Sequence, residues 1–138
     1  MEIRKLRQEE IPFIARCYEE IMKEQFKKIE EEPITRDKYK IILKKNFRDS
    51  CMFVLEDNGV KSFIWFIKED GEINIEELFS IKKGKGYGKR LMNFLFNYSR
   101  KEKIKRINID VHFKNKEALK FFKKFGFTER TIELSLDI

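Results

Sequence analysis

The sequence is poor in the residues that build metal centres and disulfide frameworks. Its 138 residues include two cysteines and one histidine, and Cys17 and Cys51 stand apart without the spacing of metal ligands. A zinc site needs a cluster of such side chains, so we expect no metal. Two isolated cysteines are typical of free thiols in a reducing compartment. We therefore predict a cytoplasmic protein in which neither cysteine acts as a nucleophile.

Long apolar runs are also missing. The longest strongly apolar run is FIWFI at residues 63–67, far shorter than a membrane span, and MEIRKLRQEE at the start does not resemble a signal peptide. We therefore expect no membrane association. Apolar and charged residues are nearly balanced, at 41% and 40%, and 14 phenylalanines supply core volume. This composition predicts one globular domain over residues 1–138.

The net charge of +7 is unevenly distributed along the chain. Residues 1–79 contain 15 Lys or Arg against 18 Asp or Glu, whereas residues 80–138 contain 16 against 6. A lysine-rich solvated surface explains such a pattern without any ligand. The alternative is a C-terminal half that meets a polyanion, either a nucleic acid or a multiply phosphorylated cofactor.

The order of secondary structure elements predicts an α+β fold. Apolar periodicity indicates helices over 9–26, from Thr35 onward, from Gly88 to about Arg100, and over 115–126. Alternating residues and turn signals indicate strands near 2–7, a meander over 51–79, and strands at 106–111 and 131–138. The predicted order is β-α-α-β-β-β-α-β-α-β, a mixed and mostly antiparallel sheet flanked by helices.

The stretch IKKGKGYGKRLMNFL, residues 81–95, places three glycines between a predicted strand and a helix. Glycine lets backbone N–H groups approach an anion closely, and a helix N-terminus adds free N–H groups. A glycine-rich turn with solubilising lysines is the simpler interpretation of these residues alone. The stretch is neither a Walker loop nor a GxGxxG dinucleotide fingerprint.

The wider sequence resembles the GNAT superfamily of N-acyltransferases. The acyl-CoA motif of that family, (Arg/Gln)-x-x-Gly-x-(Gly/Ala), matches Lys83, Gly86 and Gly88. Downstream, IDVHFKNKEALKFFKKFGF at 109–127 resembles the next strand and helix of the family, with Asn115 and Ala118 at the N-x-x-A spacing. The element order of the whole chain is also similar, which strengthens the resemblance.

The resemblance implies binding of acetyl-CoA. Backbone groups near Leu78 and Phe79 would contact the pantetheine arm and the thioester, and amides of the glycine loop would bind the pyrophosphate. The residues so implied are Leu78, Phe79, Lys83, Gly84, Lys85, Gly86, Tyr87, Gly88, Lys89, Asn115 and Phe122. The phosphates of coenzyme A then account for the basic C-terminal half without nucleic acid.

Two positions depart from the family pattern. Lys83 replaces Arg or Gln and keeps a charge without the guanidinium fork. Phe122 occupies the position at which many members carry a tyrosine that protonates the leaving thiolate. Phenylalanine donates no proton, and a general acid typically raises the rate roughly 10²–10⁴-fold. This sequence therefore predicts one of three outcomes: the thiolate leaves without an acid, catalysis is slow, or acyl-CoA binds without turnover.

Three acidic residues are candidates for the general base. The resemblance assigns Asp110 to the position at which ribosomal-protein N-terminal acetyltransferases carry a glutamate. It assigns Glu72 to the position of the base in the histone acetyltransferase branch, and Glu76 lies on the same face as Glu72 by the strand period. Each could equally be an ordinary polar residue of a strand. His112 shares the face of Asp110 and is a further possibility.

The sequence thus predicts an N-acetyltransferase that passes an acetyl group from acetyl-CoA to a primary amine by direct attack. The acceptor is a small molecule or a protein amine, and the protein is a monomer or a homodimer. A catalytically weak acyl-CoA-binding module, suggested by Phe122, is the main alternative. A basic nucleic-acid-binding domain is a third hypothesis, but the sequence contains no motif of that class.

Overall fold

The computed structural model describes residues 1–138, which form five strands, four α-helices and one 3-10 helix at Gln8–Glu10. The strands are β1 (Glu2–Lys5), β2 (Cys51–Glu56), β3 (Val60–Glu69), β4 (Glu72–Ser80) and β5 (Arg106–Ile109). The α-helices are α1 (Ile11–Lys28), α2 (Arg36–Asn46), α3 (Tyr87–Lys101) and α4 (Lys116–Lys124). No helix is both long enough and apolar enough to cross a membrane.

Local signals in the sequence set most of these boundaries. The Thr35 side chain accepts a hydrogen bond from the Lys38 amide at 3.3 Å and begins α2, and the Asn115 side chain likewise accepts from the Ala118 amide at 3.2 Å to begin α4. At the β3–β4 turn, Asp70 and Gly71 both have positive φ, at 52° and 76°, as tight hairpin turns require.

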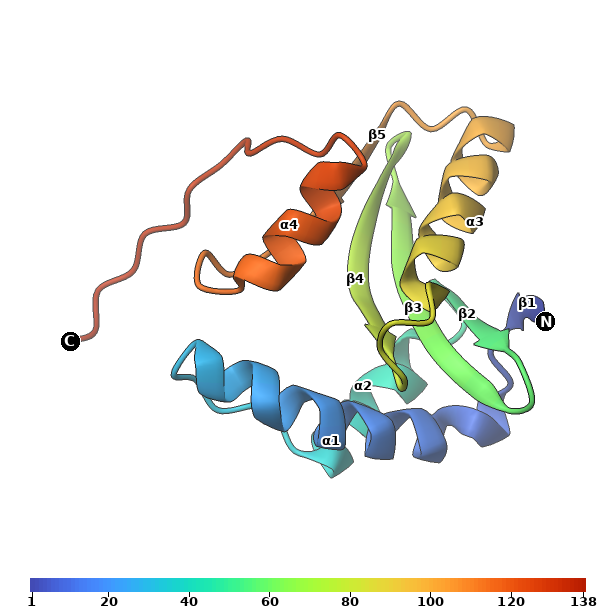
Figure 1. Cartoon of the computed structure of the whole chain (residues 1–138), viewed down its shortest axis with the longest axis horizontal. Helices are drawn as coiled ribbons and strands as arrows, with labels where there is room; N and C mark the ends of the chain where they lie inside the picture. Colours follow the sequence, from blue (N-terminus) through green and yellow to red (C-terminus); the bar gives the residue numbers. More distant parts are fainter.

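The sheet has the order β1-β2-β3-β4-β5, in which all neighbours are antiparallel except β4 and β5. One face packs against α1 and α2 in a core of 14 buried residues that includes Phe63, Trp65 and Phe79. The other face packs against α3 and α4 in a second core of 10 residues. In Figure 1, α1 and α2 lie together in the lower part of the view, and α3 and α4 lie in the upper part. The predicted α+β fold is confirmed.

A β-bulge interrupts β4 at Glu76. Trp65 pairs with Glu77, but Phe66 pairs with Ile75, so Glu76 is an extra residue without a partner on β3. A bulge shifts the side-chain alternation by one position. Accordingly, Ile73 and Ile75 belong to the core beneath α3 and α4, whereas Phe79 belongs to the core beneath α1 and α2.

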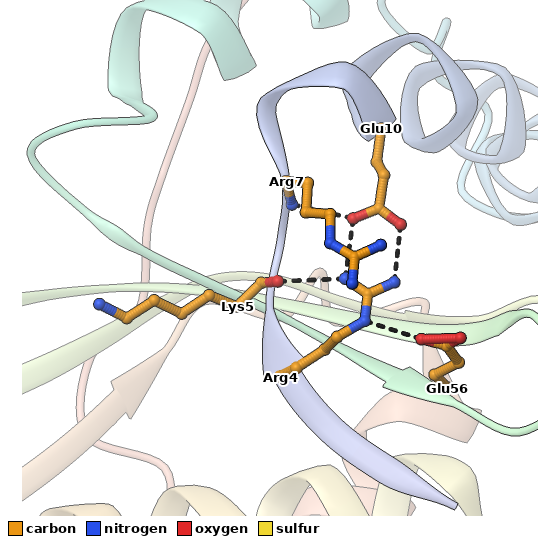
Figure 2. Close-up of polar contacts among 5 residues, drawn as sticks. All are labelled: Arg4, Lys5, Arg7, Glu10 and Glu56. Atoms are coloured by element: carbon orange, nitrogen blue, oxygen red, sulfur yellow. Dashed lines mark hydrogen bonds and ion pairs between the residues drawn. The ribbon is translucent and has the colours of Figure 1, made fainter.

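An ion-pair cluster ties the N-terminal segment to the sheet (Figure 2). The Arg4 guanidinium donates to both carboxylate oxygens of Glu10, at 2.9 and 2.8 Å, and to Glu56 Oε1 at 2.8 Å. These bonds hold the pKa of Glu10 below its usual range and connect β1, β2 and the start of α1. The cluster anchors this edge of the sheet, which is the edge opposite β5.

The predicted last strand, at 131–138, is not formed. Residues 128–138 have no regular secondary structure and extend away from the body of the protein in Figure 1. The alternation of apolar and polar residues is present in this segment, but β5 does not pair with it. The order in the structure therefore ends with α4.

Candidate functional site

The sheet opens between β4 and β5. These strands pair over only four positions, Glu72–Ile75 with Arg106–Ile109, and β4 continues for five residues beyond that pairing. The bulge at Glu76 lies at the point where the pairing stops. The backbone of residues 76–80 therefore keeps its hydrogen-bonding groups on the β5 side free, so this half of β4 can bind an extended ligand as a further strand would.

The glycine loop lies directly after this free half of β4. Gly84 and Gly86 have φ values of 78° and 75°, and Gly86 begins α3 without any side-chain cap. The first helical hydrogen bond runs from the Arg90 amide to the Gly86 carbonyl, at 3.1 Å. Amides 87–89 thus stand at a helix N-terminus with no intrahelical partner, an arrangement that favours anions.

Gly88 sits where α3 meets α4. A side chain added at Gly88 would place its Cβ 3.4 Å from the ring of Phe121 and 3.8 Å from Ser80 Oγ. Glycine at this position therefore lets the start of α3 approach both α4 and the end of β4. Phe122, next to Phe121, is only 7% exposed and packs in the core beneath α3 and α4.

The lysines of the loop are exposed, and one of them is paired. Lys83 Nζ lies 3.3 Å from Glu117 Oε1 on α4, and Lys28 Nζ at the end of α1 lies 4.0 Å from Glu117 Oε2. The remaining loop lysines, Lys82, Lys85 and Lys89, have no ion-pair partner. The loop is therefore electropositive, and its charge is only partly compensated.

Two of the predicted base candidates come together at the opening of the sheet. Asp110 directly follows β5, and desolvation, with a smaller contribution from the charge of Asp110, raises the pKa of Glu76 at the bulge. Neither carboxylate has an ion-pair partner. A carboxylate with a raised pKa accepts a proton more readily than an ordinary one, as a general base must.

Glu72 is in a different environment. Its carboxylate accepts a hydrogen bond from Asn108 Nδ2 at 2.9 Å and lies 3.5 Å from Arg106 Nη1, both on β5. The hydrogen bond from Asn108 and the charge of Arg106 lower the pKa of Glu72. The structure thus places Glu72 at the paired end of β4 and β5, away from the point where they separate.

The structure adds one carboxyl group that the sequence reasoning missed, that of Glu77. Because of the bulge, Glu77 turns toward α2, where Tyr39 Oη donates to its Oε1 over a long 3.4 Å. Burial raises the pKa of Glu77 to about 7.

Aromatic side chains surround this carboxyl group. The rings of Tyr39 and Tyr18 stack with their centroids 3.7 Å apart, and burial raises the pKa of Tyr18 to about 12. Opposite Glu77, the Nε1 of Trp65 is buried without a hydrogen-bond partner.

The two tyrosines of α3 have hydroxyl partners of their own. The hydroxyl of Tyr87 donates to Asp57 at 3.1 Å, and the hydroxyl of Tyr98 lies 3.8 Å from Cys51 Sγ. His112, the other candidate base, has its Nε2 3.5 Å from Glu31 of the α1–α2 connection. Each of these groups therefore has a partner away from the opening between β4 and β5, and none is positioned to protonate a thiolate there.

The raised pKa of Glu77 predicts how the stability of the protein depends on pH. Its carboxyl holds a proton more tightly in the folded protein than in the unfolded chain, where the ordinary pKa is 4.5. Unfolding then releases this proton, so stability falls as the pH rises from about 4.5 to 7. Glu77→Gln removes the ionisation, and we expect it to be more stable than the wild type at pH 8 by up to about 3 kcal/mol.

Urea unfolding at pH 8 and at pH 4.5 measures this difference. The gain should shrink to a small fraction of its pH 8 value at the lower pH, where the wild-type carboxyl is protonated in the folded protein and half protonated in the unfolded chain. A loss of stability equal at the two pH values would contradict the assigned ionisation and indicate only a packing change.

Comparison with known proteins identifies the family. A model of the acetyltransferase (GNAT) family matches residues 14–127, which contain the glycine loop and most of both cores. The chain belongs to the GNAT family. Solved structures agree with this fold: the PaiA N-acetyltransferase from Thermoplasma acidophilum, crystallised in complex with coenzyme A, has a TM-score of 0.81 at 22% identity, over 96% of this chain and 92% of that one.

Two further solved structures are similar over almost the whole chain. A possible acetyltransferase from Clostridium difficile 630 has a TM-score of 0.74 at 20% identity, over 99% of this chain and 96% of that one. The ribosomal-protein-alanine N-acetyltransferase from Brucella melitensis biovar Abortus 2308 has a TM-score of 0.70 at 12% identity, over all of both chains. A search of curated protein sequences gives no significant match.

Proposed function

We propose that this GNAT protein transfers an acetyl group from acetyl-CoA to a primary amine by direct attack on the thioester. The observation that carries the proposal is the position of the Gly84–Gly88 loop at the start of α3, immediately beside the unpaired half of β4. A site for an extended arm thus leads directly into a site for an anion. Coenzyme A joins a pantetheine arm to a pyrophosphate in this way.

The cofactor is proposed to lie between β4 and β5. Amides of residues 84–88 bind the pyrophosphate, the backbone at Leu78 and Phe79 binds the pantetheine arm, and the lysines of the loop neutralise the phosphates. Membership of the acetyltransferase family and the coenzyme A complex of the Thermoplasma PaiA structure support this assignment. Asn115 acts indirectly, because it begins α4, which flanks the opening.

The chemistry is proposed to take place beside the bulge. The amine nitrogen attacks the thioester carbonyl carbon, the C–S bond breaks, and the proton lost from nitrogen passes to Glu76, whose pKa is raised partly by Asp110. Free amides of β4 polarise the carbonyl oxygen, as preorganised donors do in acyl transfer. Coenzyme A leaves as a thiolate without a general acid, since Phe122 supplies no proton.

The acceptor is proposed to be cationic in its resting form. The carboxyl groups of Glu76, Glu77 and Asp110 gather where β4 and β5 separate, and none of them has a basic partner in the protein. An ammonium group compensates this charge, and it becomes a nucleophile when it gives up its proton. Small-molecule and protein amines both satisfy this chemistry.

Release of free coenzyme A from acetyl-CoA, measured with a panel of polyamines, amino acids, aminoglycosides and peptide N-termini, tests the function. We expect at least one amine to give turnover well above the hydrolysis background, with the acetyl group recovered on nitrogen by mass spectrometry. Because Phe122 replaces the usual acid, the alternative is a protein that binds acetyl-CoA without transfer. Tight coenzyme A binding with no turnover on any amine would favour that alternative.

A further inference from the structure

The C-terminal segment exposes a row of large apolar side chains. Ile132, Leu134, Leu136 and Ile138 are between 82% and 114% exposed, and polar Glu133, Ser135 and Asp137 alternate with them. This period of two is that of a strand with one buried face. Four adjacent apolar side chains in solvent form a patch that a soluble protein normally covers. We call residues 131–138 the C-terminal tail.

The sheet offers an uncovered edge that matches this tail. β5 is the last strand of the sheet, and it is hydrogen-bonded only to β4, so its outer N–H and C=O groups have no strand partner. Ile107 and Ile109 on β5 are only partly buried at the margin of the core beneath α3 and α4. An open edge with an apolar margin binds an extended amphipathic segment readily.

The tail does not reach this edge within its own chain. Lys123 Nζ on α4 lies 2.8 Å from Glu129 Oε1, so the residues just before the tail are held at the end of α4. From the end of α4 the tail runs away from the sheet (Figure 1). The tail makes no ladder with its own β5, which is hydrogen-bonded only to β4.

Charge favours another copy of the same surface as the partner. Residues 128–138 contain three acidic residues and one basic residue. The helix and strand that flank the open edge, α4 and β5, together contain five basic residues and one acidic residue. The tail of one copy thus complements the β5–α4 flank of another in charge as well as in hydrogen bonding and apolar surface.

We propose that two copies of this chain exchange their C-terminal tails, each tail adding a strand to the open edge of β5 in the other copy. The arrangement is two-fold symmetric and closed, because each copy gives one tail and receives one. It extends the sheet from five strands to six. It also covers the exposed apolar row with the margin of the core beneath α3 and α4.

Light scattering with size-exclusion chromatography and amide hydrogen exchange test the proposal on the full chain. The wild type should have twice the mass of the 16.9 kDa chain, with slow exchange in both the tail and β5. Leu134→Asp places a charge in the apolar row and should weaken dimerisation by at least about 30-fold, as loss of a central interface side chain does. Ser135→Asp, the matched control on the polar side of the same segment, should remain dimeric.

Three results would overturn the proposal. A wild-type monomer with a protected tail would mean that the tail folds onto its own β5. A wild-type monomer with an unprotected tail would mean that no second copy covers it. A dimer that Leu134→Asp leaves unchanged would place the interface elsewhere. Thermal unfolding of Leu134→Asp separates lost dimerisation from a lost fold, and these outcomes do not depend on whether the protein transfers acetyl groups.

Discussion

Replacing Gly86 with valine is expected to weaken coenzyme A binding by at least about 100-fold and to leave the fold intact. Gly86 begins α3 with a φ of 75°, a left-handed conformation that costs a β-branched residue roughly 1–2 kcal/mol. Nothing lies within 4 Å of a Cβ at this position, so the packing of the protein does not oppose the substitution.

The expected loss comes from the backbone. Valine would move the chain out of the left-handed region and turn the loop amides away from the anion site. Each hydrogen bond from a backbone amide to a charged group is worth about 1.5–3 kcal/mol. The loss of one or two such hydrogen bonds therefore accounts for a loss of affinity of this size. Isothermal titration with coenzyme A measures the affinity, and circular dichroism checks the fold.

Gly71 supplies a matched control. It lies in the β3–β4 turn with a φ of 76°, and a Cβ there would meet only the flexible end of Lys105 at 3.8 Å. Gly71→Val therefore introduces the same backbone strain outside the glycine loop, and it should retain coenzyme A binding within a few-fold. Unchanged affinity in Gly86→Val, or an equal loss in Gly71→Val, would refute the role of the loop.

Glu76→Gln is expected to lower kcat/KM by about 10²-fold or more, the range typical for removal of a general base, without weakening coenzyme A binding.

Asp110→Asn should instead change the pH dependence of the reaction. The negative charge of Asp110 contributes to the raised pKa of Glu76, so its removal lowers that pKa. The acid limb of the pH–rate profile should then move to lower pH.

Glu72→Gln is the control for both variants. Its carboxylate is already bound by Asn108 and Arg106, and its pKa is lowered, so it is a weak base. We expect less than a tenfold change in kcat/KM and no displacement of the acid limb. If Glu72→Gln instead causes the larger loss, the base lies at the paired end of the strands rather than at the bulge.

The glycine loop could be predicted from sequence because its signal is local. Glycines between a strand and a helix define both the conformation and the position of the loop, and the structure has Gly86 at the start of α3. The caps at Thr35 and Asn115 were predictable for the same reason. Each of these features depends on a few neighbouring residues and hardly at all on the rest of the fold.

The position of Glu77 required the structure. A strict two-residue period would put Glu77 on the same face as Ile73 and Ile75, whereas the bulge turns it toward Tyr39. The acidic pair Glu76-Glu77 does interrupt the alternation of β4, which is the sequence signal of a bulge. That signal cannot reveal which helix the displaced side chain meets, because α2 lies more than thirty residues earlier in the chain.

The tail failed as a strand prediction for a related reason. Its alternation describes the faces of a segment, but pairing also needs a neighbour within reach. The local pattern of residues 131–138 predicts a strand, whereas the single chain offers it no paired neighbour.

The unpartnered indole of Trp65 has a practical consequence. It belongs to the one tryptophan in the chain and lies opposite Glu77, within the layer between the sheet and α2. The intrinsic fluorescence of the protein thus originates beside a carboxyl group that titrates near neutrality. We therefore expect the emission of the unlabelled protein to change as Glu77 titrates.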